Sequence, residues 1–209
     1  MPTGMHLRDA RQQLFEAAER VLLRDGPNGL TSRAVTDEAG CAKGVLHRHF
    51  ADFDAFLTEL VLDRAAQLER QAGALRESAG TGTVAGNLSS ALTTLFGPVP
   101  VAIVPLVTFR EELRARLREA RPGGGIAILA DVAAAVGAYL ADERDRGRVA
   151  ADADLDSLTL SLVGGGHLLF ADRDPDPPAE ATVDRLVTTV LAGAVPRRPG
   201  PDRTGDSGA

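Results

Sequence analysis

The residues best suited to specific chemistry lie in the segment at positions 40–50, which reads GCAKGVLHRHF. This segment contains no acidic residue, whereas the charged stretch at 110–120, REELRARLREA, mixes both signs as a solvated helix usually does. Its basic side chains are those of Lys43, His47, Arg48 and His49. A short helix without carboxylates suits the phosphate backbone of nucleic acid, which would repel negative side chains. On charge alone, an ordinary surface helix remains the alternative.

Three other patterns resemble known sites but lack residues that those sites require. The segment at 80–85, GTGTVA, fits a loose dinucleotide-binding fingerprint, yet no strand precedes it and no acidic residue follows about twenty positions later. The alternating aspartates at 152–156 resemble the start of a calcium loop, but its central glycine and closing glutamate are missing. His47 and His49 are two positions apart, so on a helix they point to different faces and cannot hold one ion. We therefore expect no metal site, no cofactor and no enzymatic activity.

The overall charge limits the kind of nucleic-acid binding that the chain can perform. Its 209 residues carry 23 lysines and arginines against 29 aspartates and glutamates, a net charge of −6. This excess of acid argues against a protein that holds DNA by bulk charge, although it is compatible with a compact DNA-reading module. The single cysteine, Cys41, excludes an intramolecular disulfide and a zinc site built on several thiolates. We recognise neither a signal peptide nor a run of about 18 apolar residues, and expect a cytoplasmic protein without membrane contact.

The elements that must position the basic segment have helical spacing and recognisable ends. Alanine and leucine dominate the composition and β-branched residues do not alternate, so we expect an all-α fold. Helices are predicted at 8–24, 31–39, 43–50 and from 52 to about 78. Gly26 and Pro27 end the first helix, while Thr31 and Asp52 are suited to cap the second and fourth. The tight turn at Gly40 between the second and third helices predicts a helix-turn-helix arrangement.

More helical segments follow a flexible loop that we expect at 79–87. They are predicted at 88–96, 101–120, 126–146, 155–172 and 179–195. The second half of 101–120 is rich in charge and is expected to face solvent. Residues 196–209 carry no apolar run and are expected to form a disordered tail.

The order of residues from 14 to 60 resembles the DNA-binding domain of TetR-family (tetracycline-repressor-like) transcriptional regulators. In that family a helix ending at glycine precedes a threonine-started helix, an Ala-Gly turn, and a recognition helix that begins Lys-Gly and ends Leu-Tyr-x-His-Phe. The matching residues are Ala17-Ala18, Gly26, Leu30-Thr31, Ala39-Gly40, Lys43-Gly44, Leu46-His47-Arg48-His49-Phe50 and Asp54. The resemblance implies an all-α chain with a three-helix DNA-binding domain at 8–60 and a larger helical domain for ligand binding and dimerisation at 61–195.

The resemblance also implies which residues contact DNA. These are Thr31, Lys43, Gly44, His47, Arg48 and His49, with Leu46 and Phe50 in the core. Three positions depart from the family pattern. Ala42 replaces serine and removes an N-cap that contributes about 1 kcal/mol, while His47 replaces tyrosine and Phe53 replaces lysine, two residues that contact the DNA backbone in the family. These departures weaken the expected affinity for DNA and leave the expected fold unchanged.

The resulting functional prediction is a sequence-specific DNA-binding transcriptional regulator, by resemblance a repressor that a small-molecule ligand releases from operator DNA. A homodimer would place two recognition helices in successive major grooves, about 34–36 Å apart. TetR relatives dimerise through their last two helices, so we interpret the three glycines at 164–166 as part of a close-packed interface, with a helix kink as the alternative. Two other functions stay open: a degenerate family member that binds ligand but little DNA, and an all-helical ligand-binding protein.

An effector pocket is expected within the larger domain, where aromatic residues come from four different helices. Its predicted residues are Phe96, Phe109, Tyr139 and Phe170, with Arg110 and His167 as the polar groups that orient a ligand. The alternative is that these aromatic side chains simply fill the core.

Overall fold

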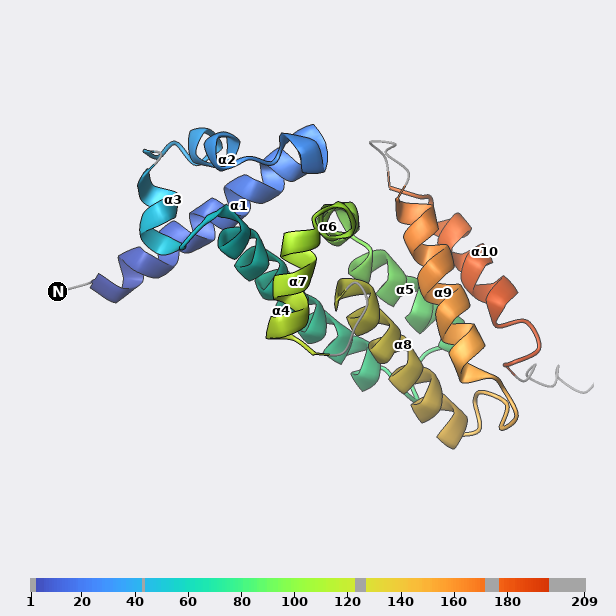
Figure 1. Cartoon of the computed structure of the whole chain (residues 1–209). Coiled ribbons are helices and arrows are strands. Elements are labelled where there is room, and N and C mark those ends of the chain that lie inside the picture. Colours follow the sequence, from blue (N-terminus) through green and yellow to red (C-terminus); the bar gives the residue numbers. More distant parts are fainter. Residues whose placement is uncertain (1–2, 43, 123–126, 172–176, 196–209) are drawn as a thin grey trace, which may run out of the picture.

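The structure, a computed structural model, describes residues 3–42, 44–122, 127–171 and 177–195, without the side chains of residues 3–9 and 127. Ten helices and no strand occur in these ranges, so the prediction of an all-α fold is confirmed. Figure 1 shows the N-terminal helices grouped at one end of the molecule, with α9 and α10 side by side at the other. The tail predicted at 196–209 lies outside the described ranges.

Four helices build the N-terminal part, with boundaries close to those that the capping residues predict. They are α1 (Thr3–Gly29), α2 (Ser32–Glu38), α3 (Gly44–His49) and α4 (Phe53–Glu77). The Thr31 hydroxyl accepts a hydrogen bond from the Ala34 amide at 3.1 Å, and the Asp52 carboxylate accepts one from the Ala55 amide at 2.7 Å. Both predicted N-caps are therefore present. Gly26, with φ of 71°, interrupts α1 near its end because a left-handed residue does not continue a right-handed helix.

Six helices build the C-terminal part, and the start of the first differs from the prediction. They are α5 (Val84–Leu95), α6 (Pro98–Phe109), α7 (Glu111–Ala120), α8 (Ala127–Asp145), α9 (Leu155–Phe170) and α10 (Glu180–Val190). The loop predicted at 79–87 is shorter, because Thr83 caps α5 by accepting a hydrogen bond from the Gly86 amide at 3.0 Å. The predicted start at residue 88 is thus wrong by about one helical turn.

The single helix predicted at 101–120 is in fact two helices that meet at Arg110. This residue has an extended backbone, with φ of −116° and ψ of 98°, which ends α6 and starts α7 in a new direction. As a result α7 packs against α4 and buries Leu113 and Leu117, while α6 packs against α1. The prediction that 110–120 faces solvent is right for its charged side only, because two leucines at i, i+4 spacing give α7 a buried side.

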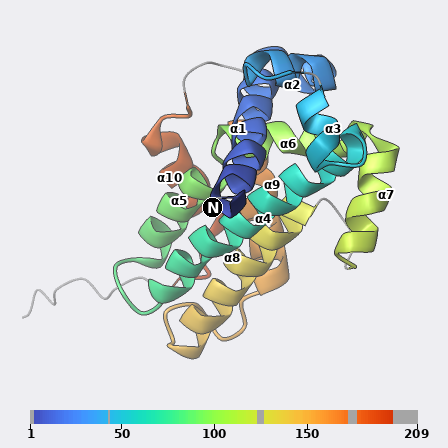
Figure 2. The same cartoon turned by 90° about the vertical axis from the view of Figure 1, so that its left-hand side faces the viewer.

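The long helix α4 connects the two ends of the molecule. It packs against α3 and α7, and further along against α5 and α8 (Figures 1 and 2). The domain boundary predicted at residue 60 falls inside α4, which runs without a break from Phe53 to Glu77. The division into 8–60 and 61–195 therefore stays a prediction.

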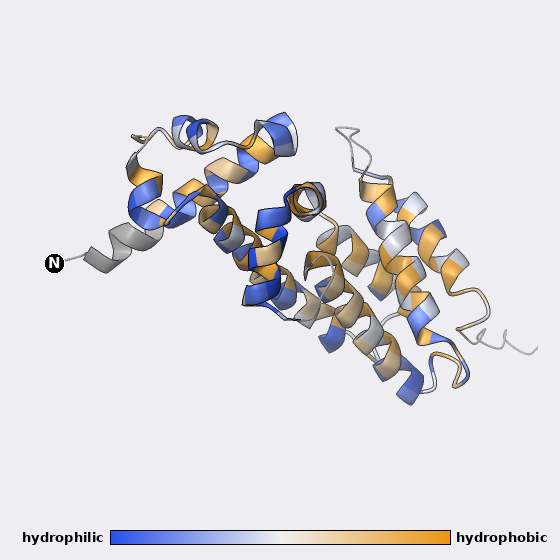
Figure 3. Cartoon of the chain, in the orientation of Figure 1, coloured by the Kyte–Doolittle hydropathy of each residue, from blue (hydrophilic) through white to orange (hydrophobic). Residues whose placement is uncertain are grey.

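Residues of high hydropathy are frequent along α5, α6, α8 and α9, as the colours of Figure 3 show. In the part of the chain that the structure describes, no single helix has the length and hydrophobicity to cross a membrane, although the bent pair α5–α6 reaches both when taken together.

The glycine triplet of α9 does not kink the helix, which is continuous along its length. A Cβ atom on Gly165 would lie 2.9 Å from Leu186 of α10, and one on Gly166 would lie 2.7 Å from the Phe96 ring after α5. These two glycines permit close packing within the chain. Gly164 differs from them, because it is exposed and has open space beside it.

Candidate nucleic-acid interface

Helix α3 turns its basic side chains to solvent and its apolar side chains to the interior. Leu46 is fully buried, whereas Gly44, His47 and Arg48 are exposed and His49 is half-buried. Four of the six predicted DNA contacts therefore lie on one short helix. Of these, the side chains of His47 and Arg48 are exposed and can reach a ligand. No acidic residue lies on α3 to repel a phosphate.

The other two predicted contacts lie outside α3. Thr31, at the start of α2, is exposed, and its oxygen accepts the capping hydrogen bond from Ala34. Its hydroxyl hydrogen can still be donated to a phosphate oxygen, because a hydroxyl both accepts and donates. Lys43 lies outside the described residues, and its contact stays a prediction.

An aromatic cluster fixes the position of α3. The Phe50 ring, which follows the helix, lies 5.9 Å from that of Phe15 on α1 and 5.0 Å from that of Phe56 on α4, measured between ring centroids. All three side chains are buried, together with Leu46. A helix of six residues is too short to be stable alone, so these contacts determine where α3 lies.

Arg11 of α1 is a residue of this interface that the sequence reasoning missed. Its guanidinium donates a hydrogen bond to the backbone carbonyl of His49 at 3.2 Å and lies over the Phe50 ring, 4.4 Å from the centroid. It also pairs with Glu59 of α4. One side chain thus joins α1, the end of α3 and α4. The only sequence signal is its place one turn before Phe15 on the same side of α1.

Glu38, the last residue of α2, forms ion pairs with two arginines of α1. Glu38 accepts hydrogen bonds from Arg20 at 2.8 Å and from Arg24 at 2.7 Å. These bonds hold the pKa of Glu38 below its ordinary value. The carboxylate therefore remains charged but paired, which reduces its repulsion of an anion near α3.

Two departures from the family pattern have clear structural consequences. Ala42 is exposed just before α3, and its methyl group cannot accept a hydrogen bond from the free amides of the helix. Phe53 is half-buried and stacks on Phe56 with 5.7 Å between ring centroids. The Arg110 guanidinium also lies over the Phe53 ring, 5.8 Å from its centroid. Phe53 is therefore a packing residue in this protein.

The structure brings together three of the six residues predicted for an effector pocket. The Phe96 ring lies 6.1 Å from the His167 ring and 6.1 Å from the Phe170 ring. His167 Nδ1 is buried and has no hydrogen-bond partner among the described residues. Burial lowers the pKa of His167, which favours the neutral imidazole at pH 7.

Tyr139, which was predicted to line the effector pocket, is fully buried, and its hydroxyl belongs to a separate polar network. It accepts a hydrogen bond from Asn87 at 3.0 Å, and burial together with a hydrogen bond to Glu143 raises its pKa. The Glu143 carboxylate is completely buried, accepts a hydrogen bond from the Gly80 amide at 3.1 Å and pairs with Arg148 at 3.3 Å. This network holds the α4–α5 loop against the end of α8.

The remaining two residues of the predicted pocket lie elsewhere. Phe109 is 82% exposed at the end of α6, and the Arg110 side chain donates a hydrogen bond to the Leu30 carbonyl at 3.1 Å. The break between α6 and α7 turns Arg110 toward the N-terminal helices, where it also lies near Asp54 and Phe53. The six residues therefore do not surround one cavity.

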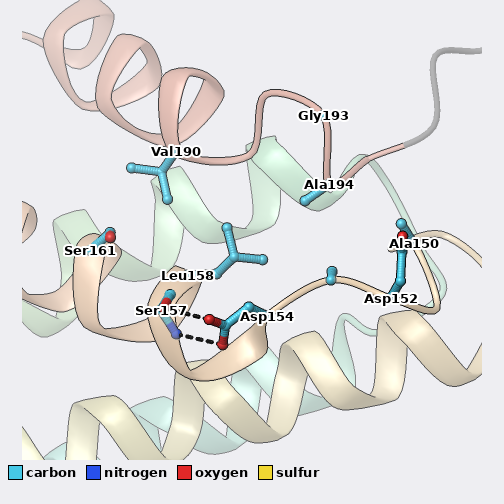
Figure 4. Close-up of a pocket in the computed structure, with 10 residues that line it drawn as sticks. Ala150, Asp152, Asp154, Ser157, Leu158, Ser161, Val190, Gly193 and Ala194 are labelled. Carbon is cyan, nitrogen blue, oxygen red and sulfur yellow. Dashed lines mark hydrogen bonds between the residues drawn. The ribbon is translucent and has the colours of Figure 1, made fainter.

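A shallow cavity of about 380 Å³ lies where the start of α9 meets the end of α10 (Figure 4). Its lining residues are Ala150, Asp152, Ala153, Asp154, Ser157, Leu158, Ser161, Val190, Gly193 and Ala194. Asp154 is the N-cap of α9 and accepts hydrogen bonds from the amide and hydroxyl of Ser157, which hold its pKa below the ordinary value. The alternation of aspartates that resembled a calcium loop is thus partly a helix cap. Within the described ranges, no group of three or more His, Cys, Asp or Glu side chains could hold a metal ion.

Comparison with known proteins agrees with this geometry. Residues 14–60 match the family described as bacterial regulatory proteins, tetR family. No curated protein matches the chain. A TetR-family transcriptional regulator from Agrobacterium tumefaciens is 13% identical with a TM-score of 0.70, covering 91% of this chain and 100% of that one.

Two further solved structures have the same architecture. NemR of E. coli in its reduced form is 14% identical with a TM-score of 0.68, covering 87% of this chain and 95% of that one. FadR of Bacillus subtilis in complex with stearoyl-CoA is 17% identical with a TM-score of 0.64, covering 87% and 98%. At these identities, the likeness to solved structures shows a shared fold.

The contacts of Arg11 generate a prediction about the stability of α3. Arg11→Ala removes the hydrogen bond to His49 and the cation–π contact with Phe50, and should lower the free energy of local opening of α3 by about 1 kcal/mol or more. Hydrogen exchange of the amides at 46–50 measures this. The control is Arg33→Ala, which removes an exposed arginine whose pair with Asp37 has an N–O distance of 3.6 Å and should change exchange little. Equal protection in both variants would contradict the role of Arg11.

Proposed function

Because the chain belongs, through residues 14–60, to the TetR family of bacterial regulatory proteins, we propose that it is a sequence-specific DNA-binding repressor that acts as a homodimer and responds to a small-molecule effector. The observation that carries the DNA-binding part is the orientation of α3. Its buried leucine faces the aromatic cluster, and His47 and Arg48 face solvent without a carboxylate beside them on the helix.

In the proposed complex α3 enters the major groove, with Arg48 and the two histidines directed at base edges and phosphates. Thr31, at the start of α2, donates its hydroxyl hydrogen to a phosphate. Gly44 lets the backbone approach the DNA closely, and Lys43 supplies a further cation. Ala42 and Phe53 supply neither the N-cap nor the backbone contact of the family pattern, which makes the contribution of α3 itself decisive.

Removal of Arg48 tests the DNA interface. Arg48→Ala should weaken binding at least about fivefold, because a specific arginine contact contributes about 1–3 kcal/mol. The probe is the duplex that the wild-type protein selects from a randomised library, and affinity is measured by fluorescence anisotropy. Arg76→Ala, which removes an exposed arginine from the far end of α4, is the control and should bind like wild type. Equal affinities of the two variants would exclude Arg48 from the interface.

The proposal of a homodimer rests on an exposed apolar stripe of α9. Leu160 and Leu168 are 75% and 77% exposed, and Gly164 lies between them at i, i+4 spacing with open space beside it. Two large leucines that flank a glycine form a surface with a gap into which a side chain of a second copy can pack. Such apolar area is unfavourable in water unless it is covered. In the resemblance to TetR relatives, the last two helices provide this contact.

Charge on the stripe should prevent dimerisation. Leu168→Glu is expected to give a monomer at micromolar concentration, since dimer formation would bury an unpaired carboxylate. Light scattering or sedimentation measures the mass. Leu23→Glu, at the 49% exposed leucine of α1, is the matched control and should remain dimeric like wild type. A dimer of Leu168→Glu as stable as that of wild type would place the interface elsewhere.

The proposed effector site is the cluster of Phe96, His167 and Phe170. Two aromatic rings offer apolar contact, and the unpartnered His167 Nδ1 offers one hydrogen bond to a polar group. The FadR structure in complex with stearoyl-CoA supports an apolar ligand for a chain of this fold. An effector with an apolar body and one polar group fits this chemistry.

A ligand screen tests this site. Acyl-CoA thioesters and aromatic carboxylates are added to the complex of wild-type protein and its selected duplex, and DNA release and Tm are measured. For a compound that releases DNA, His167→Leu should raise the required concentration about tenfold, because it removes a hydrogen bond to a buried group. The affinity of the variant for the duplex without ligand should equal that of wild type. Release at the same concentration would exclude His167 from the site.

The alternative, a degenerate family member that binds ligand but little DNA, predicts different results in the duplex selection and the ligand screen. A protein that binds a ligand but selects no duplex from the library would support it. The structural reasons would be the missing N-cap at Ala42 and the packing of the half-buried Phe53 against Phe56.

A further inference from the structure

The C-terminal helices hold the helix-turn-helix unit at both of its ends through two arginines. The unit extends from Leu30, which precedes the cap of α2, to Asp52, which caps α4 directly after α3 and Phe50. Arg110, between α6 and α7, contacts the start of the unit. Arg116, on α7, contacts its end.

At the start of the unit, the contact is made to the backbone. Arg110 Nη2 donates a hydrogen bond to the Leu30 carbonyl at 3.1 Å, and its Nη1 lies 3.9 Å from Asp54. Leu30 is fully buried, and its carbonyl directly precedes Thr31. A bond to this carbonyl therefore fixes the position at which α2 begins.

At the end of the unit, the contact is a two-pronged ion pair. Arg116 Nη1 and Nη2 donate hydrogen bonds to the two carboxylate oxygens of Asp52 at 2.9 and 3.1 Å. Its Nε donates to Glu112 at 3.1 Å, which orients the guanidinium from within α7. A bidentate pair restrains angle as well as distance. The hydrogen bonds from Arg116, followed by that from Ala55, hold the pKa of Asp52 below its ordinary value.

We propose that Arg110 and Arg116 are positioning residues that set the orientation of α3 relative to the C-terminal helices, and thereby the half-site spacing that the dimer accepts. This inference rests on the proposed function for its consequence on DNA, but the orientation itself is a property of the free protein. Arg110 lies between α6 and α7, and Arg116 lies further along α7. The break at Arg110 sets the direction of α7 and so allows the two arginines to reach both ends of the unit.

The orientation is tested without DNA. Spin labels are attached to cysteines placed at Arg33 of α2 and Arg185 of α10 in a Cys41→Ser background, and labelled chains are diluted with unlabelled protein. The double variant Arg110→Ala, Arg116→Gln should give a broader distribution of label-to-label distances than the parent. The control is the double variant Arg114→Gln, Arg118→Gln, which also removes two positive charges. These two arginines pair with Glu111 of the same helix, so their loss breaks no ion pair with the helix-turn-helix unit. An unchanged distribution in the Arg110, Arg116 variant would overturn the inference.

Asp52→Asn separates the ion pair from the helix cap. Asparagine caps a helix about as well as aspartate, so α4 should still begin at residue 53 while Arg116 loses its charged partner. The distance distribution should broaden in this variant too, with the Tm close to that of the control. A distribution as narrow as that of the parent would show that the pair does not restrain the unit.

The consequence on DNA is tested with duplexes in which the selected half-sites are moved apart by one and two base pairs. Wild type and the control should lose affinity about tenfold, because the dimer geometry fixes the spacing. The Arg110, Arg116 variant should lose clearly less affinity than wild type when the half-sites are moved apart. Its affinity for a single half-site should equal that of wild type. Wild-type protein that selects no duplex would contradict the proposed function, whereas equal spacing profiles of variant and wild type would contradict this inference alone.

Discussion

Burial of Leu46 and Phe50 between α1 and α4 is the interaction on which the candidate interface depends. Helix α3 makes too few internal hydrogen bonds to persist alone, so its outward side chains have a defined direction only because its inward ones are packed. Phe15 and Phe56 provide the surfaces that receive Phe50. Arg11 adds polar contacts at the end of the helix, where carbonyls would otherwise lack partners. The exposed side of α3 can therefore vary in sequence while the buried side cannot.

Much of the N-terminal part could be predicted because its information is local. Thr31 and Asp52 cap helices by reaching amides three residues away, and Gly26 and Gly40 adopt positive φ where the chain turns. These features need no knowledge of distant contacts. The same holds for the buried and exposed sides of α3, which follow from helical periodicity.

The C-terminal part was predicted less well because its details depend on contacts between distant residues. No glycine or proline stands at or beside Arg110 to mark the break, which reflects the packing of α6 on α1 and of α7 on α4. That break moved Phe109 and Arg110 away from the expected pocket. Tyr139 was similarly assigned from its residue type. Its partner Glu143 lies one turn further along α8 itself, whereas Asn87 comes from α5, whose pairing with α8 a single sequence does not reveal.

The buried Glu143 network has a mechanical consequence for α4. It anchors the loop that follows Glu77, so a tilt of α4 about this end would displace the opposite end. At 1.5 Å per residue, the 25 residues of α4 make an arm of about 37 Å. A tilt of about 5° would move the opposite end by about 3 Å, close to the 3.4 Å that separates neighbouring base pairs along DNA. A rotation of this size about the anchored end would thus shift α3 by about one step of the double helix.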